Sequence, residues 1–357
     1  MLWIPDIGER NDGKGLEMEN ILELNHVSFS FRTYGGVIKA VRDVSFELHP
    51  GEILGIVGES GCGKSVTAQS ILRLNPESTG FFESGSILYQ GQDIVRMQKK
   101  ELRKIRGGEI GFIFQDPMTS LNPTMKIGKQ IAEAIKKRRS LPKREIVQRV
   151  ASILKRVGIS DPERRMKQYP HELSGGMKQR IMIAMALIGS PKVIIADEPT
   201  TSLDVTIAAQ ILKLMKKLSR EMQVSVILIT HDLGVIAKTC DRVIVMYGGK
   251  ILERGTVREI FYQPAHPYTR GLLNSIATLN TKKDTKLQPI EGTPPDLFNP
   301  PVGCPFAARC KYGMHICHRE MPTHCALSDE HHVFCWLQDE KAPKVPDIFQ
   351  QNRGALC

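Results

Sequence analysis

The sequence has no long apolar run and no recognisable export signal. Its longest apolar stretch, Ile181 to Ile188, falls well short of the roughly 18 residues that a membrane-spanning helix requires. The N-terminus has no basic start followed by an apolar block, which argues against a secretory signal. Residues 1–18 are polar and contain glycine, so we expect a flexible N-terminal extension. Together these absences predict a protein of the cytoplasm.

The sequence also lacks the closely spaced cysteine pair of a zinc knuckle. Five of its eight cysteines nevertheless fall between residues 304 and 335, and a cytoplasmic location argues against stable disulfides there. Zinc modules usually carry a C-x₂₋₄-C pair, and the sequence has none. Soft thiolates also suit a four-cysteine iron–sulfur cluster. The spacing therefore predicts a metal site and leaves zinc and iron–sulfur open.

Length and charge bound the remaining possibilities only loosely. A chain of 357 residues favours one large domain with an appendage. The net charge is 49 − 38 = +11, which suits either nucleic acid or anionic lipid headgroups. Because the basic residues are spread along the chain, the net charge does not decide between nucleic acid and lipid.

Residues 58–65 read Gly-Glu-Ser-Gly-Cys-Gly-Lys-Ser, which has the form G-x-x-x-x-G-K-[ST]. An apolar strand over residues 53–57 precedes this loop, and a helix over residues 66–74 follows it. Strand, glycine-rich loop and helix N-terminus together form a cradle for phosphates. We expect Lys64 to reach the β- and γ-phosphates and Ser65 to ligate Mg²⁺. The nucleotide-binding residues predicted here are Gly58, Ser60, Gly61, Cys62, Gly63, Lys64, Ser65 and Val66.

Polar side chains follow three further buried strands. Gln115 ends the strand over residues 110–114, Asp197 and Glu198 follow residues 192–196, and His231 follows residues 224–229. In an α/β sheet, ligands bind at the carboxyl ends of the strands. We therefore expect Gln115 to complete Mg²⁺ coordination or to position the attacking water, and Asp197 to bind Mg²⁺ through water. We expect Glu198 to be the general base for water and His231 to contact the γ-phosphate.

A second anion-binding helix start occurs at residues 173–180, Leu-Ser-Gly-Gly-Met-Lys-Gln-Arg. One phosphate loop already serves this chain, so the second is explained most simply if it closes over the nucleotide of a partner subunit. Between the two lies a stretch over residues 118–172 that has helix signals and no strand-like runs, and it reads as a helical insertion. Near the N-terminus, residues 21–31 and 39–48 alternate like strands, and Phe31 is placed to stack on a nucleobase or to pack in the core.

These motifs, in this order, resemble the ABC ATPase domain, over residues 19–275. The resemblance implies an α/β fold with a P-loop NTPase core, an antiparallel β subdomain and a helical insertion. It also implies that Phe31 stacks on adenine, although Tyr34 keeps that assignment open. Asp204 resembles the aspartate that links two sites across an ATPase dimer. Ser174, Gly175 and Gly176 resemble the residues that contact the nucleotide of the opposite subunit.

Residues 264–273 and 292–296 resemble the ATP-binding subunits of bacterial oligopeptide and dipeptide importers, the oligopeptide branch more closely. That subfamily implies a C-terminal region over residues 276–345, followed by a tail over residues 346–357. The implied partners are two membrane permease subunits, a second and non-identical ATPase subunit, and an extracytoplasmic peptide-binding protein, with no nucleic acid. A homodimer is the alternative. The implied location is the cytoplasmic face of the cell membrane.

The same resemblance implies a small cysteine-rich C-terminal region that holds a [4Fe–4S] cluster. Cys304, Cys310, Cys317 and Cys335 match its ligand pattern, and Cys325 falls outside it. The expected cofactors are therefore ATP, Mg²⁺ and this cluster.

Three other functions compete with peptide import. An importer ATPase for another substrate, such as nickel, would share these motifs. A soluble ABC ATPase acting on nucleic acid or ribosomes usually has a long coiled-coil insertion or two ATPase domains, and this sequence has one such domain and no sustained heptads. An exporter ATPase is normally fused to a membrane domain, which is absent from this sequence.

Overall fold

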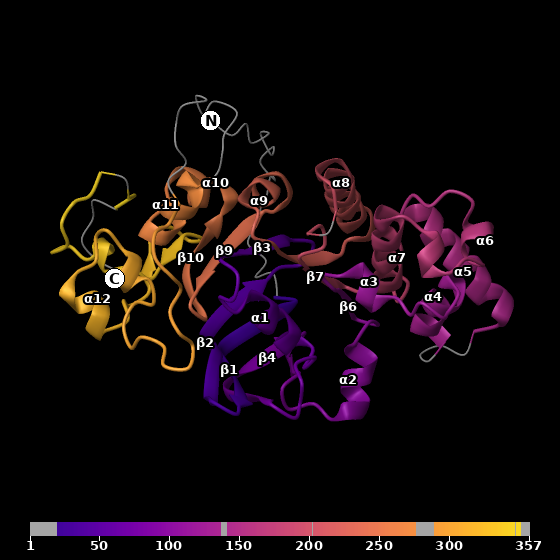
Figure 1. Cartoon of the computed structure of the whole chain (residues 1–357), viewed down its shortest axis with the longest axis horizontal. Helices are drawn as coiled ribbons and strands as arrows, with labels where there is room; N and C mark the ends of the chain where they lie inside the picture. The colour runs from indigo at the N-terminus through magenta and orange to yellow at the C-terminus, as the bar shows by residue number, and fades with distance from the viewer. Residues whose placement is uncertain (1–19, 137–140, 202, 276–288, 347, 351–357) are drawn as a thin grey trace. The chain divides into compact units, whose positions relative to one another are not determined.

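The computed structural model describes residues 20–136, 141–201, 203–275, 289–346 and 348–350 (Figure 1). The expected N-terminal extension over residues 1–18 lies outside the described residues, as do residues 351–357 of the expected tail. The chain divides into two compact units. The first comprises Met1–His49, Leu54–Val95 and Thr230–Cys357, and the second comprises Pro50–Ile53 and Arg96–Ile229.

The first unit contains an antiparallel sheet in the order β2-β1-β4-β5. The alternation in the sequence explains it, because Val44, Phe46 and Leu48 all point to one face and are buried. The pairing of the first two strands shifts register at several points, which marks β-bulges. The strands are β1 (Leu22–Thr33), β2 (Gly36–Leu48), β4 (Gly80–Tyr89) and β5 (Gln92–Asp93).

A second group of strands in the first unit has the order β11-β12-β10-β9-β3, and β3 and β9 run parallel. The predicted hairpin turn between β9 and β10 is present, and Gly248 and Gly249 both have positive φ, which such turns require. The strands are β3 (Ile53–Val57), β9 (Arg242–Tyr247), β10 (Lys250–Thr256), β11 (Cys325–Ala326) and β12 (His332–Val333). The helices are α1 (Lys64–Ile71), α9 (Leu233–Thr239), α10 (Val257–Tyr262), α11 (Pro267–Asn274) and α12 (His315–Arg319), with short 3₁₀ turns η2 (Ala307–Arg309) and η3 (Trp336–Gln338).

The second unit has a parallel sheet in the order β8-β7-β6, whose strands are buried as their apolar sequences predict. Helices α4 and α5 pack against each other and against α7. The strands are β6 (Ile110–Ile113), β7 (Val193–Asp197) and β8 (Ser225–Ile229). The helices are α2 (Lys99–Ile105), α3 (Pro117–Ser120), α4 (Ile127–Lys136), α5 (Lys143–Arg156), α6 (Pro162–Arg165), the 3₁₀ turn η1 (Pro170–Glu172), α7 (Gly175–Leu187) and α8 (Val205–Met222).

No helix within the part of the chain that the structure describes is long and apolar enough to span a membrane. The mixed α/β sheets agree with the predicted fold class.

Candidate nucleotide site

The glycine-rich loop joins β3 to α1 in the first unit, as predicted. Two of its glycines are required by close backbone contacts. A Cβ on Gly58 would lie 2.1 Å from the carbonyl oxygen of Met246, and one on Gly63 would lie 2.4 Å from that of Ala40. Gly63 also has φ +101 and caps the N-terminus of α1. The loop is therefore shaped so that the first turn of α1 is open to an anion.

Lys64 is buried at the start of α1, and its Nζ donates to the carbonyl oxygens of Gly58 (2.8 Å) and Glu59 (2.9 Å). The ammonium therefore lies over the hollow of the loop, where a phosphate would replace the two carbonyls. Cys62 is buried beneath it, and burial raises the pKa of its thiol. Cys62 is thus a neutral side chain that fills space under the loop.

In the second unit, the structure brings together two predicted residues, Gln115 and Glu198. Nε2 of Gln115 donates to Oε2 of Glu198 at 2.8 Å, and the hydroxyl of Thr201 donates to the same oxygen at 2.9 Å. Glu198 itself follows β7 with φ +45, a conformation that non-glycine residues rarely adopt and that clusters at functional sites. Two donors on one oxygen fix the orientation of this carboxylate, as its predicted role as general base requires.

Asp197 ends β7 and is buried, in register with Ile229 at the end of β8. The main chain continues the strand pairing by one residue, since Glu198 N–H donates to the Ile229 carbonyl at 3.0 Å. This carboxylate therefore lies at the carboxyl edge of the second unit's sheet, the position that its predicted role near Mg²⁺ requires.

His231 lies in the first unit, in the loop that precedes α9, and is exposed. The residue before it, Thr230, donates its N–H to the carbonyl of Ile56 at 3.2 Å. Because Ile56 belongs to the strand that leads into the phosphate loop, His231 lies at the same edge of the first unit as that loop. This agrees with its predicted position near the γ-phosphate.

Ser174 caps α7 by accepting a hydrogen bond of 3.4 Å from the N–H of Met177. Asp204 caps α8 in the same way, accepting from Ile207 at 2.9 Å. Both side chains, and Gly175 beside the first, are exposed in the single chain. The helix starts that were predicted to serve a partner's nucleotide are thus formed and open.

Comparison with known proteins supplies the family. A model of ABC transporters matches residues 41–201, and a model of the oligopeptide/dipeptide transporter C-terminal region matches residues 252–317. A dipeptide transport ATP-binding protein, DppD of Bacillus subtilis, is 56% identical over 91% of this chain and 97% of its own length. This chain is an ABC transporter ATPase.

Other relatives agree with that assignment. An oligopeptide transport ATP-binding protein, OppD of Bacillus subtilis, is 54% identical over 92% of each chain. Among solved structures, the dimeric bacterial ABC transporter cassette MJ0796 matches with a TM-score of 0.59 at 29% identity, over 66% of this chain and 99% of that chain. An ATPase of this family hydrolyses ATP, so the phosphate loop described above belongs to an enzyme.

The two aromatic rings that the sequence offers for adenine, Phe31 and Tyr34, differ in exposure. Phe31 is half-buried, and its ring packs edge-on against Phe29 at a centroid distance of 5.3 Å. Tyr34 lies at the tip of the β1–β2 hairpin and is fully exposed. Tyr34 is thus the more accessible ring, and the choice between the two stays a prediction.

The structure does not support the predicted metal site. Among the described residues, no group of three or more His, Cys, Asp or Glu side chains is placed to hold a metal ion. Burial raises the pKa of Cys304 to about 12, and it also raises the pKa values of Cys310 and Cys335.

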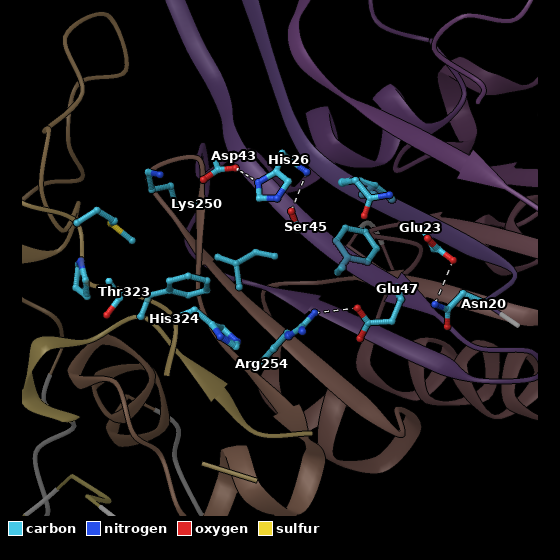
Figure 2. A pocket seen from close by; sticks show the side chains of 17 residues that line it. Asn20, Glu23, His26, Asp43, Ser45, Glu47, Lys250, Arg254, Thr323 and His324 are labelled. Atoms are coloured by element: carbon cyan, nitrogen blue, oxygen red, sulfur yellow. Dashed lines mark hydrogen bonds and ion pairs between the residues drawn. The ribbon is translucent and has the colours of Figure 1, made fainter. Parts of the chain in front are cut away.

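A cavity of about 530 Å³ in the first unit is not the nucleotide site, because no residue of the phosphate loop lines it. Figure 2 shows that its walls come from β1, β2, β10 and the segment around His324. Its charged side chains are partly paired with one another. His26 Nδ1 lies 2.7 Å from Asp43, and Arg254 donates to Glu47 at 2.9 Å.

Sequence reasoning missed three residues that touch the site. Thr201 holds the carboxylate of Glu198, and Tyr268 and Arg309 both contact Glu59 of the phosphate loop. Tyr268 lies in the segment that resembles peptide importers, and Arg309 lies next to Cys310 in the cysteine-rich region. No local pattern indicates a contact with a loop more than 200 residues away.

Proposed function

We propose that this ABC ATPase energises the uptake of peptides through separate membrane subunits at the cytoplasmic face of the membrane. One observation carries the proposal: identity above 50% to peptide transport ATP-binding proteins extends over nine-tenths of the chain, including the C-terminal region. The identities to the dipeptide and oligopeptide relatives, 56% and 54%, are too close to choose between the two substrates. The oligopeptide preference rests on residues 293–301 alone.

The residues of this chain have distinct tasks in hydrolysis. Lys64 exchanges the loop carbonyls for the β- and γ-phosphates, and Ser65 and Asp197 hold Mg²⁺, Asp197 through water. Glu198, oriented by Gln115 and Thr201, accepts the proton of the attacking water. His231 contacts the γ-phosphate, and Tyr34 stacks on the base.

We propose further that the site is completed by a second ATPase subunit. Ser174, Gly175 and Gly176 contact the nucleotide held by that partner, and Asp204 links the two sites. The exposure of these helix starts supports this arrangement, as does the dimeric state of the MJ0796 relative. Loss of the γ-phosphate would release the interface. The partner proposed here is a non-identical paralogue, and a homodimer is the alternative.

A [4Fe–4S] cluster on Cys304, Cys310, Cys317 and Cys335 stays a separate proposal. Among the described residues, no group of three or more His, Cys, Asp or Glu side chains is placed to hold a single metal ion. A four-iron cluster instead binds each thiolate at a different iron, so its ligands need not converge on one point. Supporting this, the N–H of Cys304 donates to the carbonyl of Cys317 at 2.8 Å, so the segments that carry these two cysteines are adjacent. Anaerobic purification should yield brown protein with iron and sulfide; zinc alone would overturn the proposal.

The transport proposal is tested by co-purification. Affinity capture of this chain from gently solubilised membranes should retrieve two polytopic membrane proteins and a second ATPase, with ATP turnover that rises when a peptide-loaded binding protein is added. Retrieval of ribosomes or DNA in their place would favour the soluble ABC ATPase. If a nickel-loaded binding protein stimulates ATP turnover and a peptide-loaded one does not, the substrate is nickel and not peptide.

A further inference from the structure

Glu59, the second residue of the phosphate loop, is held at three of its atoms. Its N–H donates to the phenol oxygen of Tyr268 at 2.8 Å, and its carbonyl accepts from Lys64 at 2.9 Å. Its carboxylate oxygen Oε2 lies 2.7 Å from Nη1 of Arg309. Two of these three anchors, Tyr268 and Arg309, come from the C-terminal part of the chain and not from the loop or from α1.

Arg309 is built to hold that carboxylate. Its side chain is only 6% exposed, against 25% for Glu59. Its other hydrogen bonds are to the Tyr247 hydroxyl (2.9 Å) and to the carbonyls of Ile290 (2.9 Å) and Glu291 (2.8 Å). A guanidinium fixed by neutral acceptors on several sides keeps its full charge for the one acid that it contacts.

Tyr268 is anchored just as firmly. Its N–H donates to Nδ1 of His266, a fully buried imidazole whose pKa burial lowers to about 3. The neighbouring backbone N–H groups of Ala265 and His266 donate to the buried carboxylate of Glu253. This segment therefore presents the phenol oxygen at a fixed position to the phosphate loop.

The charges explain why such anchoring matters. ATP brings several negative charges to a loop that already contains the carboxylate of Glu59, and like charges at this range repel. When phosphate draws Lys64 away from the loop carbonyls, Glu59 loses one of its three anchors. Tyr268 and Arg309 then remain on Glu59, together with the N–H of Cys62, which donates to the Glu59 carbonyl at 3.3 Å.

We propose that Arg309 is a positioning residue for ATP. It neutralises Glu59 and keeps the phosphate loop open, so the C-terminal region acts on the nucleotide site of its own chain. Through the ion pair of Arg309 and Glu59, the C-terminal region that is typical of peptide transporters contributes to ATP binding.

The test measures binding of the fluorescent analogue MANT-ATP to the full chain. Arg309→Met should weaken binding about tenfold, on the scale of one charge-assisted hydrogen bond. Adding Glu59→Gln should restore affinity to within about threefold of wild type, because the repelling charge is gone. Lys311→Met, a matched removal of positive charge two residues away, should bind as wild type.

If Arg309 only stabilises the fold, these variants should give different results. In that case Arg309→Met would lower the melting temperature, and Glu59→Gln would not rescue affinity in the double variant. Unchanged affinity in Arg309→Met, or equal losses with and without Glu59→Gln, would overturn the proposal. If Arg309→Met does not fold, MANT-ATP affinity is compared instead between Arg309→Lys alone and Arg309→Lys with Glu59→Gln. Lysine keeps the positive charge and loses the forked donors of the guanidinium. A loss of affinity from Arg309→Lys that persists when Glu59→Gln is also present would overturn it.

Discussion

The amide of Gln115 donates a hydrogen bond of 2.8 Å to the carboxylate of Glu198, although 83 residues separate them. The proposed general base is thus joined to a residue that lies just before α3 in the second unit. Any movement of α3 that displaces Gln115 would reorient the Glu198 carboxylate. In this way a membrane subunit that docks on those helices would control hydrolysis.

Glu198→Gln removes the proposed general base and keeps the side chain's shape. We expect ATP turnover to fall about a thousandfold, within the range for loss of a positioned base, while ATP binding persists. Phosphate release measures the loss of turnover, and the amount of nucleotide that stays bound measures ATP binding. Sustained turnover in this variant would remove Glu198 from the mechanism.

Thr201→Val deletes one of the two hydrogen bonds that orient Glu198. Because this bond acts on the base and not on bound substrate, kcat should drop about tenfold with KM nearly unchanged. Thr206→Val, an exposed threonine on α8, serves as the control and should behave as wild type. An increase in KM alone would place Thr201 in substrate binding.

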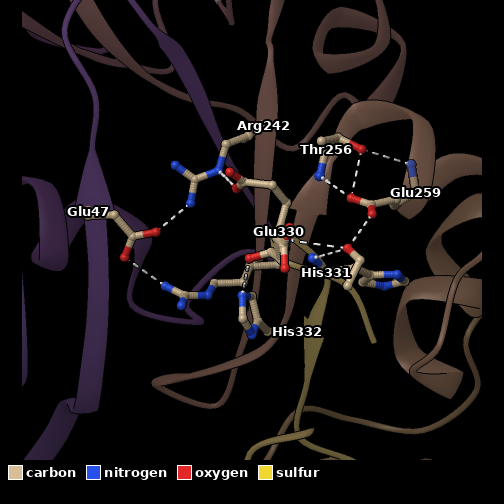
Figure 3. A network of polar contacts seen from close by, with 10 residues as sticks. Glu47, Arg242, Thr256, Glu259, Glu330, His331 and His332 are labelled. Carbon is tan, nitrogen blue, oxygen red and sulfur yellow. Dashed lines mark hydrogen bonds and ion pairs between the residues drawn. The ribbon is translucent and has the colours of Figure 1, made fainter. Parts of the chain in front are cut away.

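Glu47 predicts a pH-dependent stability in the first unit. Its carboxylate contacts Arg242 at 2.5 Å and Arg254 at 2.9 Å, and Figure 3 shows Glu47 directed at Arg242. Burial alone would raise the pKa of Glu47, but the two arginines outweigh it and lower the pKa. A folded-state pKa below that of the unfolded chain stabilises the protein above about pH 4.5, and this contribution is lost as the pH falls through the folded value.

Glu47→Gln should therefore cost about 1–2 kcal/mol of unfolding free energy near neutral pH. The difference from wild type should shrink steadily as the pH falls below about 4. Denaturant titrations at several pH values measure it, and Glu221→Gln on the exposed face of α8 is the control. A difference that stayed constant with pH would rule out the charge as its source.

Ser174→Arg tests the shared site. The bulky cation should abolish ATP turnover in the assembled transporter and leave MANT-ATP binding by the isolated chain unchanged, since the role proposed for Ser174 is at the partner's nucleotide. Ser174→Thr retains a capping hydroxyl and controls for damage to α7. Full turnover by the Ser174→Arg complex, or by a lone monomer, would contradict a site shared between subunits.

Much of this architecture was predictable because its signals are local. The strand before the phosphate loop and the 18-residue α8 lie where apolar periodicity placed them. The polar residues at strand ends followed from the rule for parallel sheets, and Gln115 and Glu198 do meet.

Other features depended on information that no local pattern contains. Alternation alone could not decide between Phe31 and Tyr34, because bulges shift the register of β1 against β2 just before the hairpin. The contact between Arg309 and Glu59 spans 250 residues and depends on tertiary packing. Cysteine spacing likewise predicted a metal site without specifying where the thiols point.

The most direct test of the central claim is uptake of a radiolabelled peptide by proteoliposomes that contain the complete transporter. With the wild-type chain, ATP supplied on the side of the membrane where this subunit lies should drive accumulation of the peptide. Glu198→Gln should reduce that accumulation to the level seen without ATP. Accumulation that continues undiminished with Glu198→Gln would show that hydrolysis by this chain does not energise peptide import.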